Sequence, residues 1–268
     1  MRGEVALVLA AILMSTLSIF VRSINADPLS IVFLRLSTAS FILLAAIFLL
    51  RKPFKPTKIM FLLGLLNLAT ISCYVSALKG IEVATAAMLL YMAAVYVIPI
   101  AILSGEKVDL QGYLALILGL SGLYLMLSPY PEMNAVIVLG LFSGVFYALV
   151  FHFTKKARNL HDSLEISAFN TAFGALVLLP YFLTHPANAD AFLIIGLGTI
   201  PTALPFTLFA YGMKYVKTSR APIISLIEPL SASLLGFFYF GEVLTDRQIL
   251  GAFLILSSIF IATKTKNI

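Results

Sequence analysis

Long apolar runs recur from one end of this sequence to the other, and each is about 20 residues long. A helix needs roughly 20 apolar residues to cross the hydrocarbon core of a bilayer. Cutting the chain at charged clusters, prolines and helix-capping residues gives ten such segments. They are residues 4–21, 28–50, 59–78, 83–103, 110–128, 133–153, 164–183, 190–212, 219–240 and 246–263. The sequence therefore predicts an all-α membrane protein with ten transmembrane helices.

Several of the segment boundaries have a physical cause. Asp27 directly precedes a proline, which places a capping carboxylate before a residue suited to the first turn of a helix. The stretches 162–165 and 245–248 have the spacing of a capping box, in which two side chains bond the free N–H groups of a helix start. Pro129 and Pro131 are expected to break the chain between the fifth and sixth spans.

The composition excludes a water-soluble globule. Hydrophobic residues make up 61% of the chain and charged residues only 11%, whereas soluble domains have about a quarter charged residues. The net charge of +6 comes from residues between the apolar segments, so it indicates membrane topology and not a nucleic-acid partner. The single cysteine, Cys73, excludes an intramolecular disulfide and a metal cluster held by cysteines alone.

Lys and Arg are distributed unevenly between the two sides of the predicted membrane. If the loops alternate, fourteen of the 18 lie on one side and three on the other, while Arg35 lies inside a span. The positive-inside rule makes the richer side cytoplasmic. This predicts a multi-pass protein of the plasma membrane with both termini in the cytoplasm. The first segment follows Arg2 as in a secretory signal, but no small-residue cleavage site precedes Asp27, so we interpret it as an uncleaved span.

A weak internal repeat divides the chain near its middle. At a shift of 136 residues, Gly105-Glu106-Lys107-Val108 aligns with Gly241-Glu242-Val243-Leu244. We therefore divide the chain into residues 1–130 and 131–268, each with five helices. Because five is odd, the second copy enters the membrane from the opposite side, which gives an inverted repeat. Such a repeat is the physical basis of alternating access and favours a transporter.

At this point the sequence resembles a known family. Phe33-Leu34-Arg35 in the second span, the Gly-Glu pairs at 105 and 241, and Glu228-Pro229 in the ninth span are similar to the EamA-type branch of the drug/metabolite transporter superfamily. The first half departs from the second because it has Met92-Ala93 at the place of Glu228-Pro229. The resemblance covers essentially the whole chain. It implies a secondary transporter, often an exporter of amino acids or related metabolites, with a central cavity between the halves.

Two ionised side chains are predicted deep within spans, where a charge costs several kcal/mol. Arg35 lies about 10 Å from the outer end of its span and Glu228 about 13 Å from the cytoplasmic end of its own, at roughly 1.5 Å per residue. Glu228 is a candidate proton-coupling carboxylate or counter-charge for a substrate amine, or else a structural hydrogen-bond acceptor beside Pro229. Arg35 is suited to a substrate carboxylate, or else it pairs with Glu228 or with backbone carbonyls and holds the halves together.

Other polar side chains within the spans are candidates for lining a substrate cavity, although each is equally suited to bonding neighbouring helices together. They are Asn67, Tyr74, Tyr91, Tyr96, Asn170 and Tyr211. Prolines concentrate in the eighth and ninth spans, and we expect these spans to line the cavity and to move.

Two other classes of protein compete with a transporter. The sequence lacks the motifs of a phosphate-binding loop, a His-Glu-x-x-His site and a Gly-x-Ser-x-Gly elbow, which argues against an enzyme or a primary pump. His152, His161 and His185 lie on both sides of the membrane, so we expect no metal site, and no cofactor is expected. A channel is disfavoured because an inverted pair within one chain is a poor template for a symmetric filter. We expect a secondary transporter of small polar metabolites, amino acids first, with protons as a candidate coupling ion; an intramembrane enzyme or a channel-like protein is the alternative.

Overall fold

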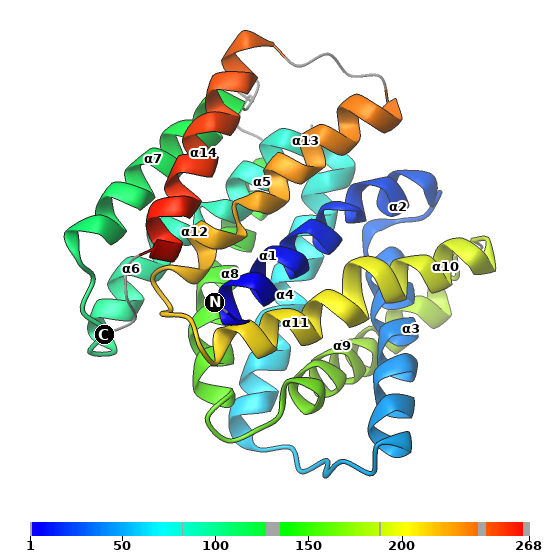
Figure 1. The fold of residues 1–268 in the computed structure, drawn as a ribbon. Coiled ribbons are helices and arrows are strands. Elements are labelled where there is room, and N and C mark those ends of the chain that lie inside the picture. The colour runs from blue at the N-terminus through cyan, green and yellow to red at the C-terminus, as the bar shows by residue number, and fades with distance from the viewer. Residues whose placement is uncertain (1, 82, 127–134, 188, 241–244, 265–268) are drawn as a thin grey trace.

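The computed structural model describes residues 2–81, 83–126, 135–187, 189–240 and 245–264, and these residues form helices joined by short connections (Figure 1). Pro129, Pro131 and the pair Gly241-Glu242 lie outside the described residues. In chain order the helices are α1 (Arg2–Ser15), α2 (Leu17–Ser23), α3 (Pro28–Leu49), α4 (Lys58–Gly80), α5 (Val83–Tyr91), α6 (Ala93–Leu103), α7 (Leu110–Met126), α8 (Ala135–Ala157), α9 (Ser163–Thr184), α10 (Ala191–Gly198), the π-helix η1 (Thr199–Ala203), α11 (Leu204–Met213), α12 (Ala221–Ser225), α13 (Ile227–Phe240) and α14 (Asp246–Lys264).

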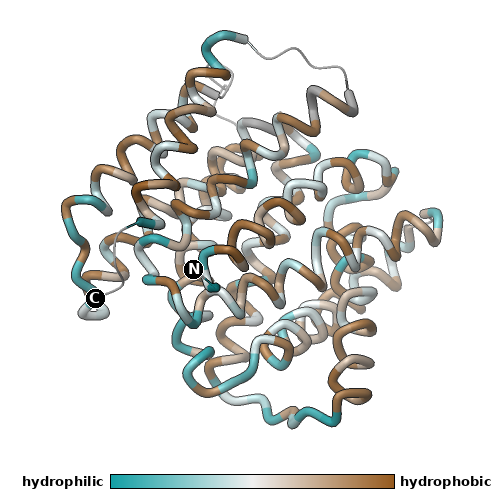
Figure 2. The backbone as a smooth tube through the Cα atoms, viewed as in Figure 1, coloured by the Kyte–Doolittle hydropathy of each residue, from teal (hydrophilic) through white to brown (hydrophobic). Residues whose placement is uncertain are grey.

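Eight helical stretches of the described chain are long and apolar enough to cross a membrane. Two shorter apolar stretches, Leu110–Leu125 and Ala221–Leu235, fall within the predicted fifth and ninth segments. Figure 2 shows the hydrophobic residues along the helices and the hydrophilic residues mainly at helix ends and in the connections. The structure is therefore an all-helical membrane protein with eight candidate spans by length and composition.

The predicted helix starts are confirmed at three places, with one difference. The Asp27 carboxylate accepts hydrogen bonds from the first free N–H groups of α3 at 3.1 and 3.0 Å. Thr245 and Gln248 form a reciprocal capping box, with bonds of 2.9 and 3.3 Å. Asp162 caps α9 at 2.8 Å, but Glu165 accepts a backbone N–H of the loop between α3 and α4 at 2.8 Å and not that of Asp162. The predicted box at this site is therefore half formed.

Four of the predicted spans are interrupted. The first breaks at Thr16, whose hydroxyl donates to the carbonyl of Leu13 at 2.8 Å, a bond that competes with the helical pattern. The fourth breaks at Met92, and the eighth contains η1. The ninth breaks at Leu226, just before Pro229, which has no N–H to donate. The sequence pattern signals the proline-associated interruptions but not those at Thr16 and Met92.

Helices that are distant in the sequence pack against each other along their lengths. The pairs are α7 with α14, α3 with α9, α4 with α8, and α1 with α11. Figure 1 shows α7 (green) beside α14 (red), so the middle of the chain and its last helix meet on one flank. A continuous core of buried apolar side chains joins residues of α1 with residues of α14 and of most helices between them.

Polar contacts close the end of the molecule at which α6, α8 and α11 finish. The Glu106 carboxylate accepts the backbone N–H groups of Thr218 and Ser219, both at 3.0 Å. Arg220 Nη2 donates to Asp109 Oδ2 at 2.8 Å. Burial alone raises the pKa of Asp109, but bonds from a backbone N–H and from Arg220 hold this pKa below its ordinary value. We call Glu106, Asp109 and residues 218–220 the clamp.

The opposite end is held by different contacts. The Lys79 ammonium donates to the carbonyl of Ile24 at 2.9 Å, which ties the end of α4 to the end of α2. The Tyr181 hydroxyl donates to Asp27 at 3.1 Å, which ties α9 to the start of α3. Successive helices therefore run between two ends of the molecule, as expected for a chain that crosses a membrane repeatedly.

Gly122 allows α7 and α14 to approach closely, and this generates a prediction about stability. A Cβ at this position would lie 2.6 Å from the carbonyl oxygen of Gly251 and 2.9 Å from Ile255. Gly122→Ala should therefore separate the two helices and lower the free energy of unfolding by about 1–3 kcal/mol. Thermal unfolding of the purified protein in detergent measures this, and Ser121→Ala, at an exposed neighbour, is the control. Equal melting temperatures for Gly122→Ala and wild type would contradict it.

Candidate functional site

A cavity of about 50 Å³ lies between α1, α2, α3, α4, α5, α8, α11 and α13, and both charged side chains predicted to lie deep in the spans line it. We call it the charged cavity. Its polar lining comes from Arg35, Asn67, Thr70, Tyr74, Tyr147 and Glu228. Arg35 and Glu228 are only 3% and 6% exposed, so both charges are removed from bulk water.

Arg35 repairs an interruption of the eighth span. Pro205 has no N–H, so the carbonyl of Pro201, four residues earlier, loses its usual helical partner. Arg35 Nη2 donates to that carbonyl at 2.9 Å, and Nε donates to the Thr202 hydroxyl at 2.8 Å. The same hydroxyl donates to the carbonyl of Leu197 at 2.7 Å within the π-helical turn. Of the partners predicted for Arg35, a backbone carbonyl is observed, whereas its bond to the Thr202 hydroxyl is an addition to the prediction.

Glu228 is bonded across the molecule to Tyr91. The Tyr91 hydroxyl donates to Glu228 Oε2 at 2.6 Å, and Tyr91 is completely buried. Tyr91 is the last residue of α5, directly before the break at Met92, and Glu228 is the second residue of α13, directly after the break at Leu226. The interruptions of the fourth and ninth spans therefore meet at one hydrogen bond.

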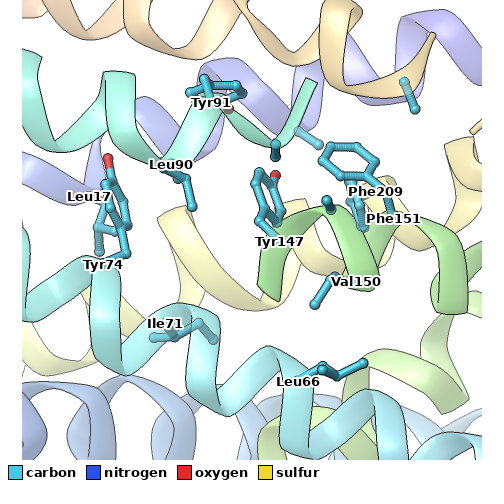
Figure 3. Packing of buried hydrophobic residues seen from close by; sticks show 14 of the residues in the cluster. Leu17, Leu66, Ile71, Tyr74, Leu90, Tyr91, Tyr147, Val150, Phe151 and Phe209 are labelled. Carbon is cyan, nitrogen blue, oxygen red and sulfur yellow. The ribbon is translucent and has the colours of Figure 1, made fainter. Parts of the chain in front are cut away.

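Aromatic rings pack around this bond, and one of them, Tyr147, also lines the charged cavity. Tyr147 of α8 packs edge-to-face on Tyr91, with ring centroids 6.1 Å apart. Its ring also packs against Phe151 and Phe209, at 4.6 and 6.3 Å. Figure 3 shows Tyr147 between Tyr91 on one side and Phe151 and Phe209 on the other, with Tyr74 across from it. Rings held in this way limit the movement of the Tyr91 hydroxyl.

A second cavity, of about 30 Å³, adjoins the first and shares Met14, Asn67, Tyr147 and Phe206 with it. We call it the neutral cavity, because its polar lining residues are uncharged. They are Asn67, Tyr147, Thr154, Ser167 and Asn170.

The eight predicted site residues fall into three groups. Arg35, Asn67, Tyr74 and Glu228 line the charged cavity, and Asn67 and Asn170 line the neutral one. Tyr91 lines neither but bonds to Glu228. Tyr96 and Tyr211 also line neither: Tyr96 packs near Gly144, and Tyr211 packs against Tyr215 with ring centroids 5.3 Å apart.

Sequence reasoning missed Tyr147, Ser167 and Thr202, which all lie at these cavities or beside Arg35. The available signal was a hydroxyl within an apolar segment, which is the criterion that selected the other tyrosines. A Ser or Thr hydroxyl in a helix often bonds to a carbonyl of that helix, so its presence in an apolar segment does not by itself indicate a cavity. Ser167 does not form that bond.

Within the described ranges, no three His, Cys, Asp or Glu side chains lie close enough together to hold a metal ion. The chemistry available at the site is therefore that of one guanidinium, one carboxyl group, and several hydroxyl and amide groups.

The model of the EamA-like transporter family matches residues 1–128 and 134–264. The chain belongs to the EamA-like transporter family. An uncharacterized transporter of Archaeoglobus fulgidus is 49% identical over 260 residues, which are 97% of this chain and 96% of that protein. The uncharacterized inner membrane transporter YicL of Salmonella typhimurium is 30% identical over 157 residues, covering 55% of this chain and 52% of its own.

A solved crystal structure has the same fold, with a TM-score of 0.83 at 19% identity over 97% of this chain and 96% of the other. The protein is thus a membrane transporter with several apolar helices. The names of the family and of its relatives describe transporters and not enzymes.

The contact of Arg35 with η1 predicts a measurable coupling. Arg35→Met should leave the Pro201 carbonyl buried without a partner and lower the free energy of unfolding by about 1–3 kcal/mol. Thr202→Val should cost less. The double variant should differ from the sum of the two single variants by about 0.5–3 kcal/mol, because the two residues share a bond. Unfolding of all four proteins in detergent measures the cycle. Strictly additive effects would show that the two residues act independently.

Proposed function

We propose that the protein is a secondary transporter that moves small polar metabolites, with amino acids as the first class of substrate, across the plasma membrane by alternating access. The observation that carries this proposal is the charged cavity, where one guanidinium and one carboxyl group line the same buried space. A buried charge is costly in a membrane, so a pair of opposite charges at a cavity suits a ligand that itself carries both charges.

The geometry leaves both groups able to take part in binding. A guanidinium has five N–H donors, and the bonds of Arg35 to Pro201 and Thr202 use two of them. The bond from Tyr91 engages one of the two carboxyl oxygens of Glu228. A substrate carboxylate would approach Arg35, and a substrate ammonium would approach Glu228. Either contact would be stronger here than in water because the site is desolvated.

The packing of the helices supports an inverted repeat of residues 1–130 and 131–268. In such a repeat α4 is equivalent to α11 and α1 is equivalent to α8. The contact of α4 with α8 is therefore equivalent to the contact of α11 with α1, and both contacts are present. In the same way α3 is equivalent to α9 and α7 to α14, and each of these equivalent pairs is also in contact. The two stretches matched by the family model, 1–128 and 134–264, fall on the same division. Two halves related in this way can exchange conformations, which is the requirement for alternating access.

The cavities are small enough to fit a closed state of a transporter, in which no substrate is bound. About 50 Å³ holds a few water molecules, since each needs about 10–15 Å³ of such volume. An amino acid would therefore bind after the halves move apart. The clamp lies between the first and second halves and closes one end. By the distribution of Lys and Arg, this end and both termini face the cytoplasm.

The proposal is tested by counterflow into liposomes that contain the purified protein. Saturable exchange of a labelled amino acid against the same unlabelled amino acid is expected. A conductance that does not saturate and shows no exchange would replace the transporter mechanism with that of a channel.

Glu228 is the candidate group for proton coupling, and this predicts a change in the pH dependence of transport. Glu228→Gln keeps the size of the side chain and its hydrogen-bonding capacity but cannot release a proton, so its counterflow rate should not vary with pH. Tyr91→Phe is the matched control, because it removes the partner of Glu228 and retains the carboxyl group. Its rate should still vary with pH. An unchanged pH profile in Glu228→Gln would exclude Glu228 as the coupling group.

A further inference from the structure

The neutral cavity contains buried polar atoms that have no partner within the described protein. Ser167 Oγ and Asn170 Oδ1 are both buried without a hydrogen bond. Ser167 is 2% exposed and Asn170 7% exposed, and both line the neutral cavity. A buried polar atom without a partner is costly, and most such atoms in native proteins bond to something, including ordered water or a ligand.

The environment of these two atoms restricts what can bond to them. No lining residue of the neutral cavity carries a charge, and the remaining wall is apolar, with Phe206, Phe209 and Ile166 among its members. A charged group placed there would lose its hydration without a counter-ion. An apolar group would fit the wall but would leave Ser167 and Asn170 without partners.

The position of the neutral cavity relates it to the charged one. The two share four lining residues, of which Asn67 and Tyr147 carry polar groups. A ligand whose charged end lies between Arg35 and Glu228 can therefore extend an uncharged end past Asn67 toward Asn170. The neutral volume, about 30 Å³, suits a group of a few heavy atoms.

We propose that the neutral cavity is the subsite for the substrate's side chain, and that it selects an uncharged group that both donates and accepts hydrogen bonds, such as a carboxamide. An amide N–H would donate to Asn170 Oδ1, and the amide oxygen would accept from the Ser167 hydroxyl. This inference rests on the proposed transport of amino acids and deepens it, because it assigns the class of side chain. Its polar lining residues come from α4, α8 and α9, so both halves of the chain contribute to it.

Three amino acids of similar length test the subsite. L-glutamine carries the carboxamide, L-glutamate replaces it with a charge, and L-methionine replaces it with an apolar group. Wild-type protein should exchange glutamine in counterflow with an apparent affinity at least about tenfold higher than for either of the others, since a bond worth about 1.4 kcal/mol corresponds to a factor of ten. Glutamine should also raise the melting temperature of the purified protein more than the other two.

Two variants remove the proposed contacts, and one adjacent variant is the control. Asn170→Leu and Ser167→Ala should each lower the preference for glutamine over methionine by about tenfold. Neither should destabilise the protein without ligand, because each removes an atom that has no partner in it. Thr171→Val is the matched control: Thr171 is buried on the same helix, bonds to its own helix at 2.9 Å and does not line the cavity. It should keep the wild-type preference.

The outcomes separate this inference from the proposed function. Saturable counterflow with no preference for glutamine, or with the same preference in Asn170→Leu as in wild type, would overturn the subsite and leave the transporter intact; water would then be the occupant. Binding of glutamine that is lost in Asn170→Leu, with no counterflow of any amino acid by wild type, would retain the subsite and overturn the proposed function.

Discussion

The bond from Arg35 to the carbonyl of Pro201 is the contact on which the centre of this molecule depends. A chain in lipid has no water to satisfy its backbone, so a helix can be interrupted only where another group replaces the lost partner. Pro205 removes that partner in the eighth span, and the guanidinium of the second span supplies a new one. The irregular helix beside the cavity therefore depends on the hydrogen bond from Arg35. Its charge in turn needs an environment such as the one that Glu228 and the polar cavity provide.

The other two interruptions at the centre follow the same principle. The fourth span is broken after Tyr91 and the ninth before Glu228, and the two residues bond to each other at 2.6 Å. The hydroxyl donor beside one break therefore meets the carboxyl acceptor beside the other. Irregular backbone and polar side chains thus occur together, because both need hydrogen-bond partners that an apolar solvent does not supply. The result is a polar centre within a molecule whose outer surface is largely apolar.

Much of this arrangement follows from the sequence, and the reason is the scarcity of charge. Apolar runs gave the positions of the helices, and capping residues gave the starts of α3 and α14. Arg35 and Glu228 could be singled out because an ionised group inside a span is rare and costly. The partners of these two residues could not be predicted. Tyr91 meets Glu228 across 137 residues, and only the packing of the helices decides which hydroxyl faces the carboxyl group. Ser167 was missed for a related reason, since a serine in an apolar segment has the same pattern whether it bonds to its own helix or faces a cavity.

The order of the cavities along the molecule has a physical consequence. Thr154 and Ser167 of the neutral cavity lie near the end of α8 and the start of α9, and Lys155, next to Thr154, donates to the carbonyl of Val216 beside the clamp. The hydroxyl and amide groups of the neutral cavity therefore lie between the clamp and the two charges, Arg35 and Glu228. Uncharged groups lose less free energy than charges when they pass between a dry and a wet state. In the proposed alternating-access cycle, a neutral stretch next to the clamp would let that end hydrate and dehydrate at a lower cost than a charged one. The separation of charge from the closing end is thus as much a property of the fold as the pairing of Tyr91 with Glu228.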